Sequence, residues 1–137
     1  MFVVDANVTM AWCSEDEATE ATEAVLDRLR SERALVPAIW PLEVANVLLV
    51  AHRRSRVNEA QIGRFVHLLA QLPIDVDETS ADVASLVALG RTHELSSYDA
   101  SYLLLAERAG LPLATLDDRL AKAAARAGVP LVIPPLT

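Results

Sequence analysis

The segment Met1-Phe2-Val3-Val4-Asp5-Ala6-Asn7 opens the chain with a short apolar run that stops at a carboxylate. The run is rich in β-branched residues and too short for a helix, so it predicts a buried strand. In open parallel sheets, ligands gather just beyond the carboxyl ends of the strands, where a cation or a phosphate would meet Asp5. The alternative is that Asp5 only caps the helix that follows, since Asp and Asn are common helix-capping residues.

The length and charge of the chain limit what kind of protein it is. Its 137 residues predict one domain spanning 1–137, long enough to bury a core without a disulfide. The net charge of -7 argues against a protein that grips nucleic acid through a generally basic surface. Local contact stays open, because Arg53 and Arg54 lie together and offer forked donors to phosphate. The alternative for these two is a solvated helix end near the C-terminal dipole.

The cysteine and hydropathy patterns predict a soluble cytoplasmic protein. The single cysteine, Cys13, excludes an internal disulfide and suits a reducing compartment. No stretch without charged residues is long enough to cross a membrane, and no basic leader precedes the acid at position 5.

Strand and helix patterns alternate along the chain, which implies an α/β layered fold with a largely parallel sheet. Further strands are predicted at 34–37, 74–77, 111–114 and 129–133. Helices are predicted over 14–31, 42–55, 58–72, 98–109 and about 120–127. One more helix should begin at a cap formed by Thr79 or Ser80 and run to about Gly90. The apolar interior of 44–51 predicts a helix buried on more than one side.

Several common catalytic motifs are absent from the sequence. Glycine occurs only at 63, 90, 110 and 128, so neither a dinucleotide fingerprint nor a phosphate-binding P-loop is present. His52, His67 and His93 match no zinc spacing, and a catalytic triad would lack its nucleophile elbow.

Four acids remain, each at the edge of a predicted element within apolar surroundings. They are Asp5 after the first strand, Glu43 and Asp99 in the first turns of two helices, and Asp117 after the fourth strand. Each alone is explained by capping or by the helix dipole, which favours a first-turn acid by up to about 1 kcal/mol. In a parallel sheet, however, Asp5 and Asp117 would face the same crevice. The sequence alone does not bring Asp99 there.

Together these segments resemble the PIN-domain nucleases, and among them the VapC toxins of bacterial toxin–antitoxin pairs. The matching motifs, in order, are Val3-Val4-Asp5-Ala6-Asn7, Pro41-Leu42-Glu43-Val44-Ala45-Asn46-Val47-Leu48, Leu95-Ser96-Ser97-Tyr98-Asp99-Ala100-Ser101-Tyr102 and Leu113-Ala114-Thr115-Leu116-Asp117-Asp118-Arg119-Leu120. Motifs in the right order from end to end are far more specific than any one of them. The resemblance implies a three-layer PIN-like fold, with a central, mostly parallel sheet of about four to five strands flanked by helices.

The resemblance also implies a metal site that cuts RNA with Mg²⁺ or Mn²⁺. The residues carried over as metal ligands and catalytic residues are Asp5, Glu43, Asp99 and Asp117. Asn7 and Thr115 would support them, although Asn7 stands where many relatives have Ser or Thr. Asp118 competes with Asp117, and the spacing from Thr115 favours Asp117.

The chemistry of clustered acids agrees with the resemblance. Two carboxylates about 4 Å apart repel by roughly 4 kcal/mol at an effective dielectric constant near 20, so a hard divalent ion is the natural occupant between them. Mg²⁺ takes only one or two direct carboxylates and keeps several waters. Because a bound metal activates water, we expect hydrolysis of a phosphodiester bond without a covalent enzyme intermediate. Whether one or two metal ions act stays open.

The resemblance implies two protein partners in addition to the RNA substrate. One is a small VapB-like antitoxin whose tail lies in the active-site groove, and the other is a second copy of the toxin, which gives a homodimer within a toxin–antitoxin hetero-oligomer. Apolar helices between 42 and 109 offer surface for such contacts. The candidate RNA contacts are Arg53, Arg54 and Arg119. No membrane partner is expected.

Two other classes of protein fit part of the pattern. A phosphotransfer domain would need a second acid at Asn7 or a lysine late in the sheet, but the only lysine, Lys122, lies in a predicted helix. The second class is a catalytically silent PIN-like binding module. It is disfavoured because all the acids of the motif are present.

Overall fold

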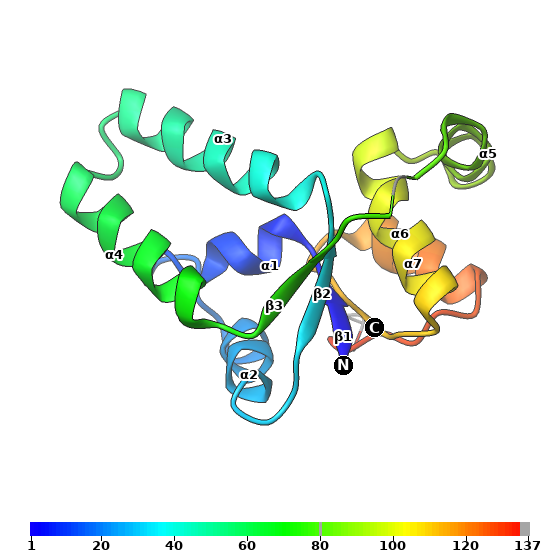
Figure 1. The fold of residues 1–137 in the computed structure, drawn as a ribbon, viewed down its shortest axis with the longest axis horizontal. Coiled ribbons are helices and arrows are strands. Elements are labelled where there is room, and N and C mark those ends of the chain that lie inside the picture. Colours follow the sequence, from blue (N-terminus) through cyan, green and yellow to red (C-terminus); the bar gives the residue numbers. More distant parts are fainter. Residues whose placement is uncertain (80, 135–137) are drawn as a thin grey trace.

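The computed structural model of the chain describes residues 1–79 and 81–134 and contains a four-stranded parallel sheet (Figure 1). The strands are β1 (Phe2–Val4), β2 (Ala34–Pro37), β3 (Ile74–Asp77) and β4 (Leu113–Ala114). Their order across the sheet is β3-β2-β1-β4, and each neighbouring pair is parallel. The prediction of an α/β fold with a mostly parallel sheet is therefore confirmed.

Helices cover both faces of this sheet, as Figure 1 shows. They are α1 (Ala6–Ala11), α2 (Glu20–Arg28), α3 (Trp40–Arg53), α4 (Glu59–Gln71), α5 (Val83–His93), α6 (Ser97–Ala109) and α7 (Asp118–Arg126). Helices α1 to α4 follow β1 and β2 on one side, where α3 and α4 extend as an antiparallel pair. Helices α5 to α7 lie on the other side, and α6 packs across β1, β2 and β4.

The strand order creates a reversal of chain direction beside β1. From β1 the chain winds outward through β2 to β3, then crosses back by way of α5 and α6 to pair β4 with the other edge of β1. The carboxyl ends of β1 and β4 therefore diverge into connections on opposite faces of the sheet. In open α/β sheets a crevice at such a switch point is where ligands bind. Asp5 and Thr115 are the first residues beyond these two strand ends.

The core lies between the sheet and α6, and β1 is its centre. All three residues of β1 are fully buried, as a strand paired on both edges and covered on both faces should be. Tyr102 and Leu103 of α6 are buried against it. Burying a side chain of this size contributes roughly 1.5–3 kcal/mol, so these positions carry much of the stability.

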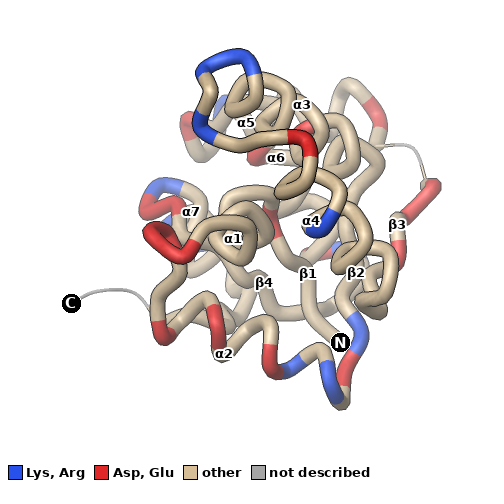
Figure 2. The backbone as a smooth tube through the Cα atoms, turned by 90° about the vertical axis from the view of Figure 1, so that its left-hand side faces the viewer, with Lys and Arg blue, Asp and Glu red and all other residues tan. Residues whose placement is uncertain are grey.

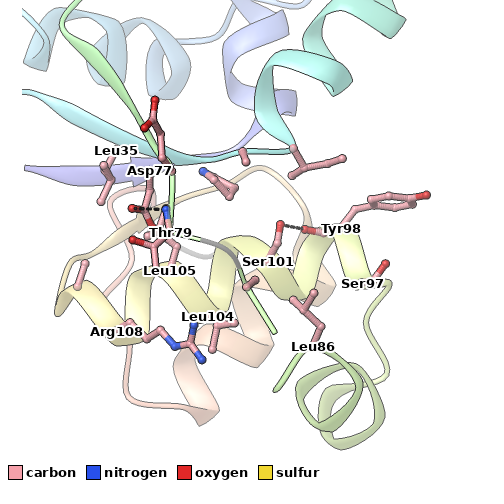
Figure 3. Close-up of a pocket in the computed structure, with 16 residues that line it drawn as sticks. Leu35, Asp77, Thr79, Leu86, Ser97, Tyr98, Ser101, Leu104, Leu105 and Arg108 are labelled. Atoms are coloured by element: carbon pink, nitrogen blue, oxygen red, sulfur yellow. Dashed lines mark hydrogen bonds between the residues drawn. The ribbon is translucent and has the colours of Figure 1, made fainter. Parts of the chain in front are cut away.

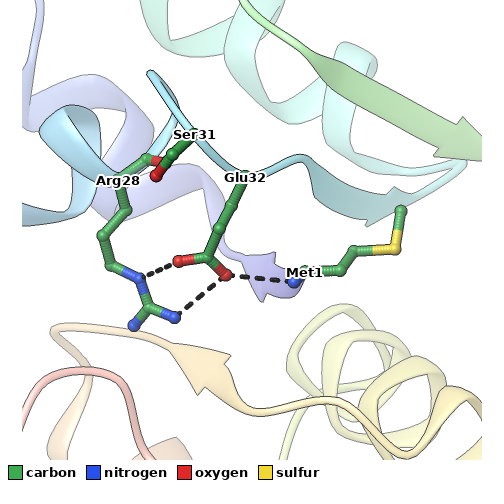
Figure 4. Close-up of polar contacts among 4 residues, drawn as sticks. All are labelled: Met1, Arg28, Ser31 and Glu32. Atoms are coloured by element: carbon green, nitrogen blue, oxygen red, sulfur yellow. Dashed lines mark hydrogen bonds and ion pairs between the residues drawn. The ribbon is translucent and has the colours of Figure 1, made fainter.

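The amino end of β1 is held by an ion pair on the side of the sheet opposite the switch point (Figure 4). Glu32 accepts a hydrogen bond from Arg28 Nε at 2.7 Å and another from the amino group of Met1 at 3.0 Å. The guanidinium of Arg28 also lies 4.9 Å from the centre of the Phe2 ring. These contacts fix where β1 enters the sheet.

Two helix starts predicted from acid and hydroxyl residues are wrong. The acidic stretch at 14–17 forms turns, and α2 begins later because Thr19 and Thr22 form a reciprocal capping box. The helix predicted from Thr79 or Ser80 starts instead after Asp82, whose carboxylate accepts from the backbone N–H of Ser85. Ser80 itself lies outside the described residues.

Two further expectations are corrected by the packing. Helix α3 is not buried on more than one side: Val44 and Leu48 face the core, but Leu49 is 54% exposed. Its outer face is covered by no other described element, so its apolar composition alone did not predict burial. The strand predicted at 129–133 is reduced to a single parallel bridge between Leu131 and Leu113. Within the described part of the chain, no helix is both long and apolar enough to span a bilayer.

Candidate active site

Asp5 is held at the carboxyl end of β1 by hydrogen bonds to both of its carboxylate oxygens. The backbone N–H of Val8 donates to Oδ1 at 2.9 Å, and the Thr115 hydroxyl donates to Oδ2. Both sequence interpretations therefore apply, since Asp5 caps α1 and also stands at the switch point. Burial raises the pKa of Asp5 to about 6, against the effect of these two hydrogen bonds, and Asp99 and Asp117 raise it further.

Thr115 links the acids that follow the two central strands. Its hydroxyl donates to Asp5 and accepts a hydrogen bond from the backbone N–H of Asp117 at 3.0 Å. Asp117 in turn accepts from the backbone N–H of Leu120 at 2.8 Å and so begins α7. Because one hydroxyl serves both acids, the register between β1 and β4 sets their relative position.

Glu43 lies in the first turn of α3, and its position is fixed by a tyrosine on another helix. The hydroxyl of Tyr102, a residue of α6 that is only 1% exposed, donates to Glu43 Oε1 at 2.7 Å. Burial raises the pKa of Glu43, the Tyr102 hydrogen bond lowers it, and the nearby Asp99 raises it. The bond connects the helix after β2 with the helix that crosses back beneath the sheet.

Asp99 lies half-buried in the first turn of α6, one turn before Tyr102. Burial raises its pKa, the charge of Asp117 raises it again, and a hydrogen bond from Ser96 and the guanidinium of Arg119 lower it. Asp99 is thus an electrostatic neighbour of all the other site acids, since it also acts on Asp5 and Glu43. The structure brings together the acids that the sequence could only place on separate elements.

A buried chain of hydrogen bonds ties the start of α3 to the backbone at Asp5. The indole Nε1 of Trp40 donates to the Thr9 hydroxyl at 3.0 Å, and that hydroxyl donates to the Asp5 carbonyl at 2.9 Å. Both side chains are buried. Polar groups in such a position hold their partners firmly, because breaking one bond would leave a buried group unsatisfied. Glu43, one turn after Trp40, is therefore positioned relative to Asp5.

The donor set suits a hard cation. It offers carboxylate oxygens that are partly desolvated, and none of the acids at 5, 43, 99 and 117 forms an ion pair within the described chain. As they stand, no three His, Cys, Asp or Glu side chains in that part of the chain are grouped to hold a metal ion. This looser arrangement fits Mg²⁺, which binds one or two carboxylates directly and reaches the others through water.

Comparison with known proteins gives this geometry a family. The PIN domain profile matches residues 2–126. The chain belongs to the PIN-domain family. It is 30% identical over 122 residues to a protein named Ribonuclease VapC3 from Pyrobaculum aerophilum, covering 88% of this chain and 92% of that one.

Solved structures agree with the assignment of the PIN fold. The crystal structure of PAE2754 from Pyrobaculum aerophilum superimposes with a TM-score of 0.70 at 25% identity, covering 89% of this chain and 83% of that one. A structure titled as a toxin–antitoxin complex from Klebsiella pneumoniae shares the fold with a TM-score of 0.61 at 20% identity, covering 85% of this chain and 87% of that one. The three-layer PIN-like architecture predicted from the motifs is confirmed.

Several residues predicted to serve this PIN domain lie elsewhere. Arg53 and Arg54 end α3, about 15 Å along the helix from Glu43 at a rise of about 1.5 Å per residue. Figure 2 shows basic residues gathered at this turn between α3 and α4. Asn7 is exposed on α1, and Asp118 pairs with Lys122 at 2.9 Å on the outer face of α7. Asp118 thus faces away from the acids.

The sequence reasoning missed Tyr102 and the pair of Thr9 and Trp40. Tyr102 stands three residues after Asp99, so both lie on one face of α6, and that spacing was the available signal. No local pattern indicated that its hydroxyl would meet Glu43, a residue on another helix. Thr9 gave no signal, because a buried threonine on a short helix has no characteristic spacing.

Proposed function

We propose that this PIN domain is a metal-dependent endoribonuclease that hydrolyses RNA phosphodiester bonds and acts as the toxin of a VapBC-type pair. The observation that carries the proposal is the convergence of Asp5, Glu43, Asp99 and Asp117 at the switch point of the sheet without a cation of the protein's own. The family and the name of the Pyrobaculum relative, a ribonuclease, support it.

Each acid has a distinct task in this proposal. Asp5 and Asp117, held by Thr115, form the fixed part of the site at the strand ends. Glu43 and Asp99 project from helix starts on opposite faces of the sheet and close it from both sides. Mg²⁺ or Mn²⁺ bound among them would lower the pKa of a water and neutralise charge on the phosphate. The raised pKa values of the metal-free acids reflect the charge that the ion would balance.

An acidic PIN domain needs cations on its surface to hold an RNA strand. Arg119 lies in the first turn of α7 and is close enough to Asp99 to lower its pKa, so it is placed to meet a phosphate at the site itself. Arg53 and Arg54 would meet phosphates farther along the strand, at the tip of the α3–α4 pair. The strand would then run along α3.

Cleavage by the purified chain tests the proposal. A mixture of structured and single-stranded RNAs should be cut with Mg²⁺ or Mn²⁺, and excess chelator should stop the reaction. Asp5→Asn should abolish cleavage while the circular dichroism spectrum is retained. Asp118→Asn is the matched control, because that exposed acid pairs with Lys122 and should leave cleavage within about twofold. Undiminished cleavage in chelator, or equal loss in both variants, would contradict the proposal. Absence of cleavage under all conditions would favour a silent binding module.

We also propose an antitoxin and a second toxin copy as partners. The Klebsiella structure of the same fold is a toxin–antitoxin complex, which supports the first. Exposed apolar side chains on α5, Val83 and Val87, support the second, since such a face on a charged protein indicates a contact. The chain alone should have the mass of a dimer in light scattering. A monomer, with Val83→Lys behaving identically, would exclude the dimer.

A further inference from the structure

One aromatic ring stands apart from the others in this chain. Tyr98 is 58% exposed, whereas the remaining Phe, Trp and Tyr side chains are buried or half-buried: Phe2, Trp12, Trp40, Phe65 and Tyr102. An exposed ring contributes little to folding. Its place in the molecule therefore calls for another use.

Tyr98 lies directly beside the site acids. It is in the first turn of α6 next to Asp99, and four residues before Tyr102, whose hydroxyl reaches Glu43. Residues four apart share a helix face, so Tyr98 continues the face of Tyr102 outward toward solvent. Figure 3 shows the ring projecting from the N-terminal end of α6, away from the labelled leucines of the adjoining cavity.

The same ring borders the start of α3. Tyr98 and Ile39 line one apolar cavity of about 490 Å³ between α6 and the end of β2. Ile39 precedes Glu43 by four residues and accepts its backbone hydrogen bond at 3.0 Å. The Tyr98 ring is thus located between the two helix starts that carry Asp99 and Glu43.

Apolar exposure beside the acids is repeated on other elements. Leu42, which is 67% exposed, precedes Glu43, and Leu116, which is 45% exposed, precedes Asp117. An acidic site bordered by exposed apolar groups suits a ligand that is charged at one point and flat and apolar beside it. A nucleotide within a single strand has this character, since its phosphate and its base are separate groups.

We propose that the Tyr98 ring stacks on an unpaired base next to the phosphate that is cut. The inference rests on the proposed function and narrows its substrate to RNA that is single-stranded at the cut. Aromatic side chains beside a backbone-binding groove hold single strands in this way, because every base has a face that can stack. A base within a duplex is already stacked and paired, so it could not reach the ring. A protein covering Tyr98 would also cover Asp99, which suits an inhibitor but not an active enzyme.

The test is a double-mutant cycle between the ring and the base. A single-stranded RNA with a mapped cut is prepared intact and with an abasic nucleotide on either side of the cut. Stacking is worth about 5- to 150-fold in binding per base, so kcat/KM for intact RNA should fall by that range in Tyr98→Ala. The wild-type chain should lose a similar factor on one of the abasic RNAs. The variant on that RNA should lose nothing more.

Two variants serve as controls. Tyr98→Phe keeps the ring and should retain kcat/KM within about twofold, while Val66→Ala removes an exposed apolar side chain from α4 and should have no effect. The loss in Tyr98→Ala should appear in KM more than in kcat, and duplex RNA should be cut poorly by the wild-type chain.

The outcomes separate this inference from the function it rests on. A chain that cuts no RNA with either metal refutes both. A chain that cuts RNA, but in which Tyr98→Ala is fully active or the two losses multiply, refutes the stacking alone. A change of molecular mass in Tyr98→Ala, with the abasic effect unaltered, assigns the ring to a protein interface and likewise overturns the proposal.

Discussion

The Tyr102 hydroxyl should control the metal affinity of the site through Glu43. Tyr102→Phe removes one oxygen and keeps the ring that fills the core beside β1, so the fold should persist. The change takes away the donor that holds Glu43 Oε1 at 2.7 Å. It also removes the hydrogen bond that lowers the pKa of Glu43, while the burial that raises this pKa remains. Glu43 should therefore become harder to ionise and freer to move.

The structure indicates the size of these effects. A hydrogen bond to a charged group contributes roughly 1.5–3 kcal/mol. Losing a partner that orients a metal ligand costs about 10- to 100-fold in metal affinity, which corresponds to roughly 1.4–2.8 kcal/mol. Both estimates agree, since the same bond is lost. Because protonation of Glu43 competes with the metal, the deficit should be largest at acid pH and shrink as the pH rises.

Titration of the metal-free chain with Mn²⁺, followed by calorimetry from pH 5.5 to 8, measures this directly. Tyr98→Phe is the matched control, because it removes the same atom from an exposed ring and should leave metal affinity unchanged. Combining Tyr102→Phe with Glu43→Gln should add little to the effect of Glu43→Gln alone. Equal metal affinity for Tyr102→Phe and the wild-type chain across this pH range would refute the reasoning.

Three further perturbations follow from the site. Because burial raises the pKa of Asp5 from 3.8 to about 6, folding favours its protonated form, so the metal-free chain should lose up to about 3 kcal/mol of stability from this group as the pH rises from 4 to 7; thermal melts of Asp5→Asn should lack this loss, and an unchanged pH dependence would contradict it. Thr115→Val should reduce metal affinity by about 10- to 100-fold, whereas Thr115→Ser should restore it; equal affinities would show that the hydroxyl is dispensable. Arg119→Ala should lower cleavage more than the pair Arg53→Ala and Arg54→Ala, which should instead weaken RNA affinity and reduce its dependence on salt by about one unit of slope per phosphate lost; an unchanged salt slope in the double variant would exclude these two contacts.

Local patterns predicted the strands better than the helix starts. The runs at 34–37 and 74–77 appear as β2 and β3 with the expected bounds, because β-branched residues between turn residues have few alternatives. Helix starts failed where several capping residues competed within a few positions. Asp82 prevails over the predicted caps at 79 and 80 because it also pairs with Arg108 of α6, which helix periodicity does not reveal.

By itself, the sequence determined the order of strands and helices and the four acids that end or begin them, since each follows from neighbouring residues. Only the tertiary structure decided that these acids meet. The Thr115–Asp5 and Tyr102–Glu43 bonds join residues 110 and 59 positions apart. Such contacts depend on which strand pairs with β1 and on which face α6 crosses the sheet, and those choices are made by the packing of the whole core.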